Sequence, residues 1–402
     1  MIKKISKGLR IIKHNGIMDG SKIILNKLLL RYNKLNLFEM YEYVCFGSNK
    51  SSFMPDNFEN ITVIWFLPDF GIGSGGHLNI FRMIYNLSKF GVKSDIAICG
   101  KSQWVNVDIA KKMIDKHFFK LNSEVAIIEN KDDMDKLKGY HIAMATSWQT
   151  AYYVNYFSKC YKKAYFIQDF EPFFYPVGSD YVFAENTYKF GFYGITAGHW
   201  LSDKLSKEYN MRCENFSFSY DKELYTNIKR EKDNKKVFFY ARPPTSRRAF
   251  ELGLLALKKL CDLNPDIEVV FAGWDISDYD IPFKHSSLGI LELKELPKVY
   301  AQCDVALILS LTNLSLLPLE LLASGCPVVC NEGSNNSWID KDKKLFIYAK
   351  IDVDSIVEKL NGVLHGEISL DFDYIKEFLN KTSWEKESKV VYKILENILK
   401  VK

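Results

Sequence analysis

The stretch that decides the predicted fold of the second half of the chain is Ser310-Leu-Thr-Asn-Leu-Ser-Leu-Leu-Pro-Leu-Glu320-Leu-Leu-Ala-Ser-Gly325-Cys-Pro-Val-Val-Cys330. The apolar runs at Val305–Leu309 and Pro327–Cys330 predict buried strands, and Pro318 suits the first turn of a helix over about 318–324. A strand, a helix and a strand in this order form the unit of a parallel sheet. One carboxylate, Glu320, lies in this apolar unit. Because an unpaired buried carboxylate is costly, we expect Glu320 to have a hydrogen-bonding role.

The same alternation of apolar strands and amphipathic helices extends outward in both directions. In the second half it predicts strands at Val237–Tyr240 and Glu268–Ala272 and helices at about 246–262 and 295–302. In the first half the predicted elements are a strand at Ile61–Leu67, a glycine loop at Gly71–Gly76, a helix at Leu78–Phe90, and strands at Ser94–Cys99, Val125–Ile128, His141–Ala145, Ala164–Ile167 and Gly194–Thr196.

The polar run 229–236 predicts a linker between two α/β domains. We predict a basic helical extension over 1–50, a first domain over 51–222, a second over 223–382 and a C-terminal helix over 383–402, with Trp384–Leu399 helical by pattern. Open parallel sheets bind ligands beyond the carboxyl ends of their strands. The sequence therefore predicts a central cleft faced by both domains.

Charge is distributed unevenly along this 402-residue chain of net charge +5, since residues 1–50 hold ten Lys and Arg against three acidic residues. Ile2, Ile5, Leu9 and Ile12 recur at helical spacing among lysines, which favours either a helix packed on the body or contact of residues 1–34 with an anionic membrane surface. The near-neutral remainder argues against nucleic acid as a partner. We expect no secretory signal, no membrane span, reduced cysteines, and a cytoplasmic protein, peripheral at the inner membrane face if the segment binds lipid.

The loop Gly71-Ile-Gly73-Ser-Gly75-Gly76 fits the G-x-G-x-x-G pattern of dinucleotide sites. However, the following strand ends in Cys99-Gly100-Lys101 and not in the acidic residue that would hold a ribose, so a Rossmann oxidoreductase stays an alternative only. Glycines let backbone approach a ligand closely. Gly75, Gly76 and the adjacent His77 are therefore candidate cleft residues, with helix capping as the other reading of His77.

Three guanidinium groups, Arg242, Arg247 and Arg248, follow the predicted strand at Val237–Tyr240. Guanidinium binds phosphate bidentately, which suits a diphosphate leaving group. The alternative to phosphate binding is that these arginines are solvated residues at the start of a helix, and this alternative suits Arg247 better than Arg242. Loop amides before Glu320 would hold phosphate oxygens while Glu320 accepts from nucleoside-sugar hydroxyls, unless it only stabilises the helix start. The donor-site candidates are Arg242, Arg248, Gly273, Asn313, Ser315, Leu316 and Glu320.

The segment Gln168–Tyr175 combines the carboxylates of Asp169 and Glu171 with aromatic rings, a mixture that binds sugars, although aromatic clusters are also common in cores. Asp169 and Glu171 are therefore acceptor-site candidates. The pairs Asp278/Asp280 and Asp371/Asp373 imitate a metal-binding D-x-D but lie in polar loops, so we expect neither a metal nor a cofactor.

Several of these segments together resemble the GT-B glycosyltransferases of the family 4 type, and among them bacterial rhamnosyltransferases that build surface rhamnan chains. The residues concerned are Asp304–Ser310 with Leu317–Val329, Gly73–His77, Gln168–Phe173, Thr196–Leu201 and Tyr240–Pro243, spread over about residues 60–345. The resemblance implies two Rossmann-like domains, a nucleotide-sugar donor on the second and a lipid-linked or polymer glycan acceptor on the first. It thereby adds His199 to the cleft residues.

The activity that this resemblance implies is transfer of a deoxyhexose, most plausibly rhamnose from dTDP-rhamnose, with retention and without an essential metal. The catalytic candidates are Asp169, Glu171 and Arg242, and we expect Arg242 and Glu320 to converge on the nucleotide. Two departures favour an alternative, a non-catalytic carbohydrate- or nucleotide-binding module. Thr312 stands where family 4 enzymes often have a first glutamate, and Gln168 replaces the usual histidine before Asp169.

Overall fold

A computed structural model of the protein describes residues 36–226 and 235–400. The chain divides into two compact units, residues 1–45 and 46–402. The described part of the first unit holds the short helix α3 (Leu37–Met40), capped by Asn36, and a 3-10 turn, η1 (Glu42–Cys45). Most of the predicted basic extension, including residues 1–34, therefore lies outside the described residues.

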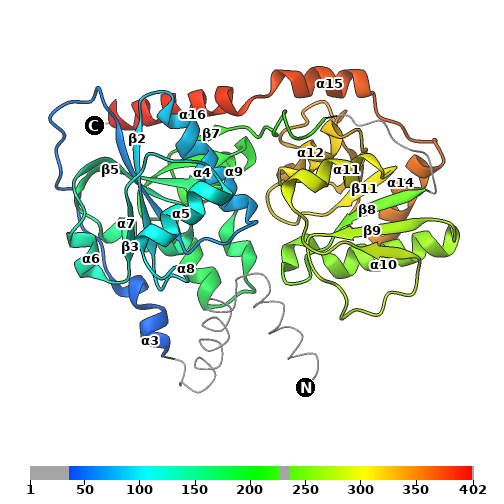
Figure 1. Ribbon diagram of the computed structural model, residues 1–402, viewed down its shortest axis with the longest axis horizontal. Helices are drawn as coiled ribbons and strands as arrows, with labels where there is room; N and C mark the ends of the chain where they lie inside the picture. The colour runs from blue at the N-terminus through cyan, green and yellow to red at the C-terminus, as the bar shows by residue number, and fades with distance from the viewer. Residues whose placement is uncertain (1–35, 227–234, 401–402) are drawn as a thin grey trace. The chain divides into compact units, whose positions relative to one another are not determined.

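The second unit begins with a seven-stranded parallel sheet in the order β3-β2-β1-β4-β5-β6-β7 (Figure 1). Its central strands are apolar and almost fully buried, as parallel sheets covered on both faces require. The bounds are β1 (Thr62–Pro68), β2 (Lys93–Cys99), β3 (Val125–Ile128), β4 (Tyr140–Ala145), β5 (Cys160–Ile167), β6 (Tyr193–Ala197) and β7 (Cys213–Phe216).

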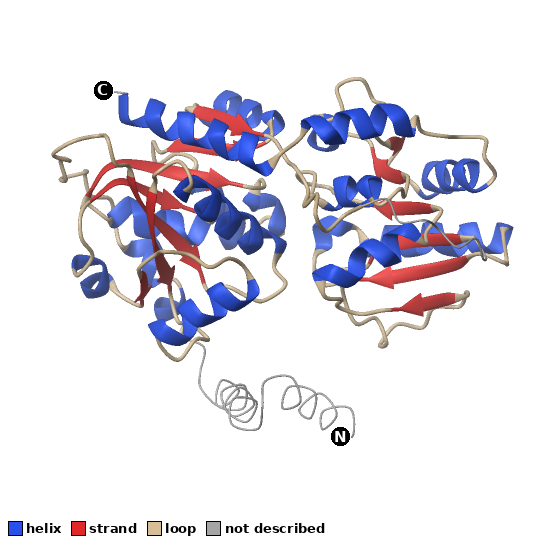
Figure 2. Ribbon diagram, turned by 45° about the horizontal axis from the view of Figure 1, so that its top comes forward, coloured by secondary structure: helices blue, strands red, loops and turns tan. Residues whose placement is uncertain are grey.

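Helices connect these strands, and Figure 2 shows them on both faces of the sheet. Side-chain caps mark where four of them begin, since Ser74, Asn106, Asn130 and Ser147 each accept from a backbone N–H of the first turn. The helices are α4 (Gly75–Ser88), α5 (Val107–His117), α6 (Lys131–Asp135), α7 (Trp148–Tyr156), the 3-10 turn η2 (Glu171–Phe174), α8 (Ser179–Thr187) and α9 (His199–Tyr209).

A second parallel sheet follows in the order β10-β9-β8-β11-β12-β13. Its strands are β8 (Lys236–Tyr240), β9 (Glu268–Ala272), β10 (His285–Ser287), β11 (Val305–Ile308), β12 (Val328–Asn331) and β13 (Ile347–Ala349). The connecting elements are η3 (Ser246–Arg248), α10 (Phe250–Leu263), η4 (Leu293–Glu295), α11 (Leu296–Ala301), α12 (Leu317–Ala323), α13 (Ser334–Ser337), α14 (Val353–Leu364) and α15 (Phe372–Lys381).

The last described helix, α16 (Trp384–Lys400), returns to the first sheet and packs on α4 and β7. The buried carboxylate of Glu387 accepts from the Ser217 backbone N–H at 2.7 Å, and the Tyr392 ring lies 5.7 Å from that of Phe90. The chain thus crosses twice between the two α/β domains. None of the helices in the described residues combines the length and apolar character that crossing a membrane requires.

Two parallel-sheet α/β domains confirm the predicted fold class. In each sheet the strand order reverses once, between β1 and β4 in the first and between β8 and β11 in the second. Ligands bind at such switch points because the adjacent loops diverge there. The segments after β5, β8 and β11 hold the candidate residues Asp169, Arg242 and Asn313.

We predict that Gly253→Ala destabilises the second domain. A Cβ on Gly253 of α10 would lie 2.3 Å from Cζ of Phe239, a fully buried ring of β8. Overpacking of this kind costs about 2 kcal/mol. The matched control is Gly75→Ala, because a Cβ at that helix start meets nothing within 4 Å. Urea denaturation of both variants checks this, and equal midpoints would contradict the packing described.

Candidate functional site

Asp169, directly after β5, joins the two α/β domains. Its Oδ1 accepts from the Asn313 backbone N–H at 2.8 Å, and its Oδ2 accepts from Thr312 Oγ1 at 2.8 Å. The Arg247 Nε lies 3.5 Å from the same Oδ2, and the Asp169 side chain is 13% exposed. Two hydrogen bonds and one ion pair from the second domain therefore converge on one carboxylate of the first.

Asn313 makes four side-chain hydrogen bonds, two of them to the first domain. Its Nδ2 donates to the carbonyls of Gln168 at 3.0 Å and Ala197 at 2.8 Å, while its Oδ1 accepts from Trp338 Nε1 at 2.9 Å and from Leu314 N–H at 3.0 Å. The residue is 1% exposed. Both polar atoms of the carboxamide thus have hydrogen-bond partners. The two bonds from Nδ2 hold the segment Thr312–Leu314 against the first domain.

Trp338 packs against the Gly198–His199 junction before α9. Gly198 has φ +87°, and a Cβ there would lie 2.5 Å from Cε2 of the indole. Both the backbone conformation and the close approach therefore require glycine. The candidate residue His199 lies edge-on to this indole, with ring centroids 6.2 Å apart.

The glycine loop is tied to the segment that holds Asp169. Gln168 donates from Nε2 to the Gly76 carbonyl at 3.1 Å, and the side chains of Ser74 and His77 are 2.9 Å apart at the start of α4. Burial lowers the pKa of His77 to about 4, so the imidazole is neutral at neutral pH. Gly75 and Gly76 are exposed, which leaves their backbone accessible to a ligand.

Glu171, predicted as a catalytic and acceptor residue, is instead buried inside the first domain at 6% exposure. Its Oε1 accepts from Tyr165 Oη at 2.7 Å and its Oε2 from the Trp148 backbone N–H at 2.9 Å. Burial, opposed by these bonds, raises the pKa of Glu171 to about 7. Because both oxygens have internal partners, the structure argues against the acceptor contact expected of this side chain and assigns it a place in the scaffold.

Arg242 lies at the carboxyl end of β8 beside two aromatic rings. Its guanidinium carbon is 5.6 Å from the ring centroid of Trp274 and 6.0 Å from that of Tyr240. Gly273 adopts φ +112°, and a Cβ there would lie 2.6 Å from the Tyr240 ring. Glycine at 273 thus lets Tyr240 and Trp274 stand beside the arginine.

The other two arginines contact neighbouring loops. Arg248 donates from Nη1 to Ser310 Oγ at 2.8 Å, in the loop that leads to Asn313. Arg247, for which a solvated helix start was the preferred interpretation, has its guanidinium carbon 3.8 Å from the Phe174 ring centroid besides its ion pair with Asp169. The sequence offered no way to foresee this contact, because Phe174 belongs to the other domain.

Glu320, which we expect to converge with Arg242 on the nucleotide of a donor, lies near charged residues of the first domain. Burial raises the pKa of Glu320 to about 7, and the positive charge of Arg82 opposes this rise. Arg242 and Glu320 follow the neighbouring strands β8 and β11, and their convergence on one nucleotide stays a prediction. Helix α12, which holds Glu320, starts without a side-chain cap, and Ser315 and Leu316 before it are half-buried.

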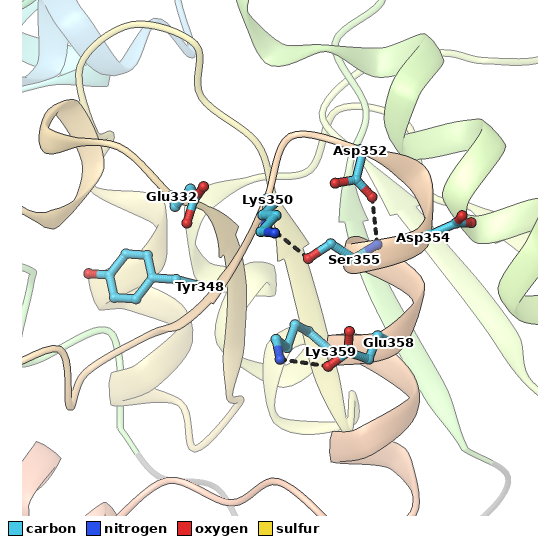
Figure 3. A pocket seen from close by; sticks show the side chains of 8 residues that line it. All are labelled: Glu332, Tyr348, Lys350, Asp352, Asp354, Ser355, Glu358 and Lys359. Carbon is cyan, nitrogen blue, oxygen red and sulfur yellow. Dashed lines mark hydrogen bonds and ion pairs between the residues drawn. The ribbon is translucent and has the colours of Figure 1, made fainter.

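A pocket of about 390 Å³ lies elsewhere, where β12, β13 and the start of α14 meet (Figure 3). Four acidic residues and two lysines line it, together with Tyr348 and Ser355. None of the candidate residues is among them, and the excess of carboxylates suits a diphosphate poorly. One of the carboxylates, Asp352, caps the start of α14 by accepting from the Ser355 backbone N–H, so this side chain has a structural role.

The described residues contain no group of three or more His, Cys, Asp or Glu side chains that could hold a metal ion. Asp371, one of the residues that imitated a metal-binding pair, caps α15 by accepting from the backbone N–H groups of Asp373 and Tyr374. Asp278 and Asp280 are exposed in the loop after β9.

We predict that Glu171→Gln becomes progressively more stable relative to the native protein as pH rises. A carboxyl whose folded pKa is about 7 against an ordinary 4.5 favours folding when protonated, so its contribution is lost between about pH 4.5 and 7. The full effect is about 3 kcal/mol at most. Denaturant titrations at pH 5 and pH 8 measure the difference. Glu171→Ala, which leaves Tyr165 and the Trp148 N–H unpaired, should be destabilised at both pH values; a pH-independent Glu171→Gln difference would contradict the assignment.

Comparison with known proteins agrees with this architecture. The WsaF N-terminal domain matches residues 100–197 and the WsaF C-terminal domain matches residues 235–361. The O-antigen biosynthesis protein RfbC of Myxococcus xanthus is 31% identical over 347 residues, which is 84% of this chain and 27% of RfbC. The chain thus spans about a quarter of the length of this curated relative.

Solved structures of low sequence identity share the fold. Anabaena Alr3699/HepE in complex with UDP has a TM-score of 0.64 at 12% identity, covering 83% of this chain and 99% of that one. TarM, known from S. aureus, has a TM-score of 0.67 at 10% identity, covering 86% of this chain and 100% of that one. With its two parallel-sheet domains in the same order, the chain carries the N-terminal and C-terminal domains of WsaF on the GT-B fold.

Proposed function

We propose that this protein is a glycosyltransferase of polysaccharide biosynthesis that moves a sugar from a nucleotide donor to a glycan acceptor. The observation that carries the proposal is the contact of Asp169 with Thr312 and Asn313, which brings a carboxylate of the predicted acceptor domain onto the predicted donor loop. The match to two WsaF domains, the O-antigen biosynthesis role of RfbC and the UDP bound in the HepE structure support the same proposal.

The donor would bind at the carboxyl ends of β8 and β9. There Arg242 provides a guanidinium for the diphosphate, and the 37%-exposed Trp274 beside it offers a ring on which a base can stack. Arg248, through Ser310, would hold the loop whose Ser315 and Leu316 amides face the phosphates. Glu320 remains a candidate for the nucleoside-sugar hydroxyls. The positive charge of Arg82 favours the ionised carboxylate that this role requires.

Thr312 fits an active enzyme better than a lost activity. It stands where family 4 enzymes often have a glutamate, and its Oγ1 donates to the Asp169 carboxylate at 2.8 Å. A carboxylate is therefore present at this place, supplied by the first domain. We infer that Asp169 takes part in sugar recognition or transfer, while Arg242 stabilises the charge of the leaving diphosphate. No covalent nucleophile and no metal enter the proposed reaction.

The finer assignment extends the sequence resemblance: a family 4 enzyme that transfers rhamnose from dTDP-rhamnose, with retention, to a lipid-linked or polymer acceptor. His77, neutral beside the exposed Gly75 and Gly76, and His199 beside Trp338 would line the acceptor side. Such an acceptor favours a cytoplasmic enzyme held at the inner membrane face, with the basic residues 1–34 on the anionic lipid surface.

We predict that Arg242→Ala lowers transfer from dTDP-rhamnose to a rhamnosylated acceptor by about 100-fold, because the leaving diphosphate loses a fixed cation. Release of dTDP measures the rate. Arg212→Ala is the matched control, since this exposed arginine of the first domain lies over Tyr193 and should be dispensable.

The same assay separates the alternatives. Donor binding without transfer in the native protein would favour a non-catalytic binding module. Absence of nucleotide-sugar binding, together with a thermal shift on adding NAD(H) or NADP(H), would favour an oxidoreductase and contradict the proposal.

A further inference from the structure

We propose that Trp338 is a positioning residue that sets the conformation of the donor loop, Thr312–Leu316, by orienting the carboxamide of Asn313. The inference rests on the proposed function for the meaning of the loop, but its geometry is independent of any ligand. No sequence pattern pointed to Trp338, which lies just after α13.

The indole N–H selects one of the two orientations of the Asn313 carboxamide. Trp338 Nε1 at 2.9 Å and Leu314 N–H at 3.0 Å both donate, so they require the oxygen on their side. The carbonyls of Gln168 and Ala197 accept, so they require the nitrogen on theirs. A flipped carboxamide would oppose donor to donor and acceptor to acceptor at all four contacts. Of the two donors, Trp338 is the one outside the loop itself.

The orientation of Asn313 in turn fixes the loop that leads to α12. The Asn313 backbone N–H donates to Asp169 Oδ1 at 2.8 Å, and the Leu314 N–H also donates to the Asn335 carbonyl at 3.0 Å. Helix α12 begins at Leu317, only four residues after Asn313. The amides of Ser315 and Leu316 therefore have their directions set by the bonds of Asn313.

Trp338 is itself held by the first domain. It is 5% exposed, its ring lies 5.4 Å from that of Phe218, and Gly198 allows the indole against the backbone before α9. Trp338 thus connects the first domain to Asn313, beside the direct bonds that Asn313 makes to Gln168 and Ala197. This links the contact between the domains to the arrangement of the donor site.

A second tryptophan provides a matched control. Trp384, at the start of α16, also lies beside the crossing between the domains, and its buried Nε1 has no hydrogen-bond partner in the structure. Trp338→Phe and Trp384→Phe therefore make the same chemical change, at a buried and at a half-buried indole. Only the first removes a hydrogen bond.

Hydrogen–deuterium exchange of the full chain tests the proposal directly. In Trp338→Phe we expect exchange of the Asn313 and Leu314 amides to rise about five-fold, the effect of losing one hydrogen bond that opposes local opening. Trp384→Phe should leave these amides at the native rate. Equal exchange of the 312–316 segment in both variants would overturn the inference, as would an increase spread over the whole second domain.

Titration with dTDP provides the functional readout. Trp338→Phe should weaken dTDP binding about five-fold, because the loop loses one hydrogen bond. Trp384→Phe should bind dTDP within about two-fold of the native affinity. Unchanged dTDP affinity in Trp338→Phe would overturn the positioning role. If the native protein binds neither dTDP nor UDP, the proposed function fails, while the exchange experiment still decides whether Trp338 orders the loop.

Discussion

The carboxylate of Asp169 is the constraint on which the rest of the site depends. A carboxylate that is largely removed from water needs hydrogen bonds or a counter-charge, because its desolvation is otherwise uncompensated. Asp169 receives both from the second domain: an N–H from Asn313, a hydroxyl from Thr312 and the guanidinium of Arg247. Hydrogen bonds to an ionised acceptor are stronger than neutral ones. This one residue therefore couples the end of β5 to the loop after β11.

The coupling gives the two domains a shared active region. Each domain has its own parallel sheet, and the donor loop is held by hydrogen bonds to the first domain. The Asn313 side chain makes two hydrogen bonds to the first domain and two within the second, and glycine at position 198 lets Trp338 approach the backbone before α9. In a transferase this arrangement would connect donor binding with the presence of the acceptor domain, a coupling that positioning catalysis requires.

The sequence predicted the buried strands well because a parallel sheet covered on both faces has continuous apolar strands. The strands that it missed, β7, β10 and β13, lie at the edges of the sheets, and β7 and β10 are polar stretches without periodicity. The site was predicted less well. Asp169 and Asn313 were chosen, but their contact joins residues 144 positions apart, which no local pattern reveals. Glu171 lies in the same aromatic segment as Asp169. Only the folded structure shows that Tyr165 and the Trp148 backbone donate hydrogen bonds to its carboxylate.

A double-mutant cycle between Asp169 and Thr312 tests the account most directly. Asp169→Asn weakens the acceptor and Thr312→Val removes the hydroxyl that donates to it, with little change of shape. The affinity for dTDP is measured in the native protein, both single variants and the double variant. The account predicts that the double variant loses no more affinity than the worse single variant, so that the effects are strongly non-additive. Independent, additive losses, or dTDP binding unaffected by any of the three variants, would contradict it.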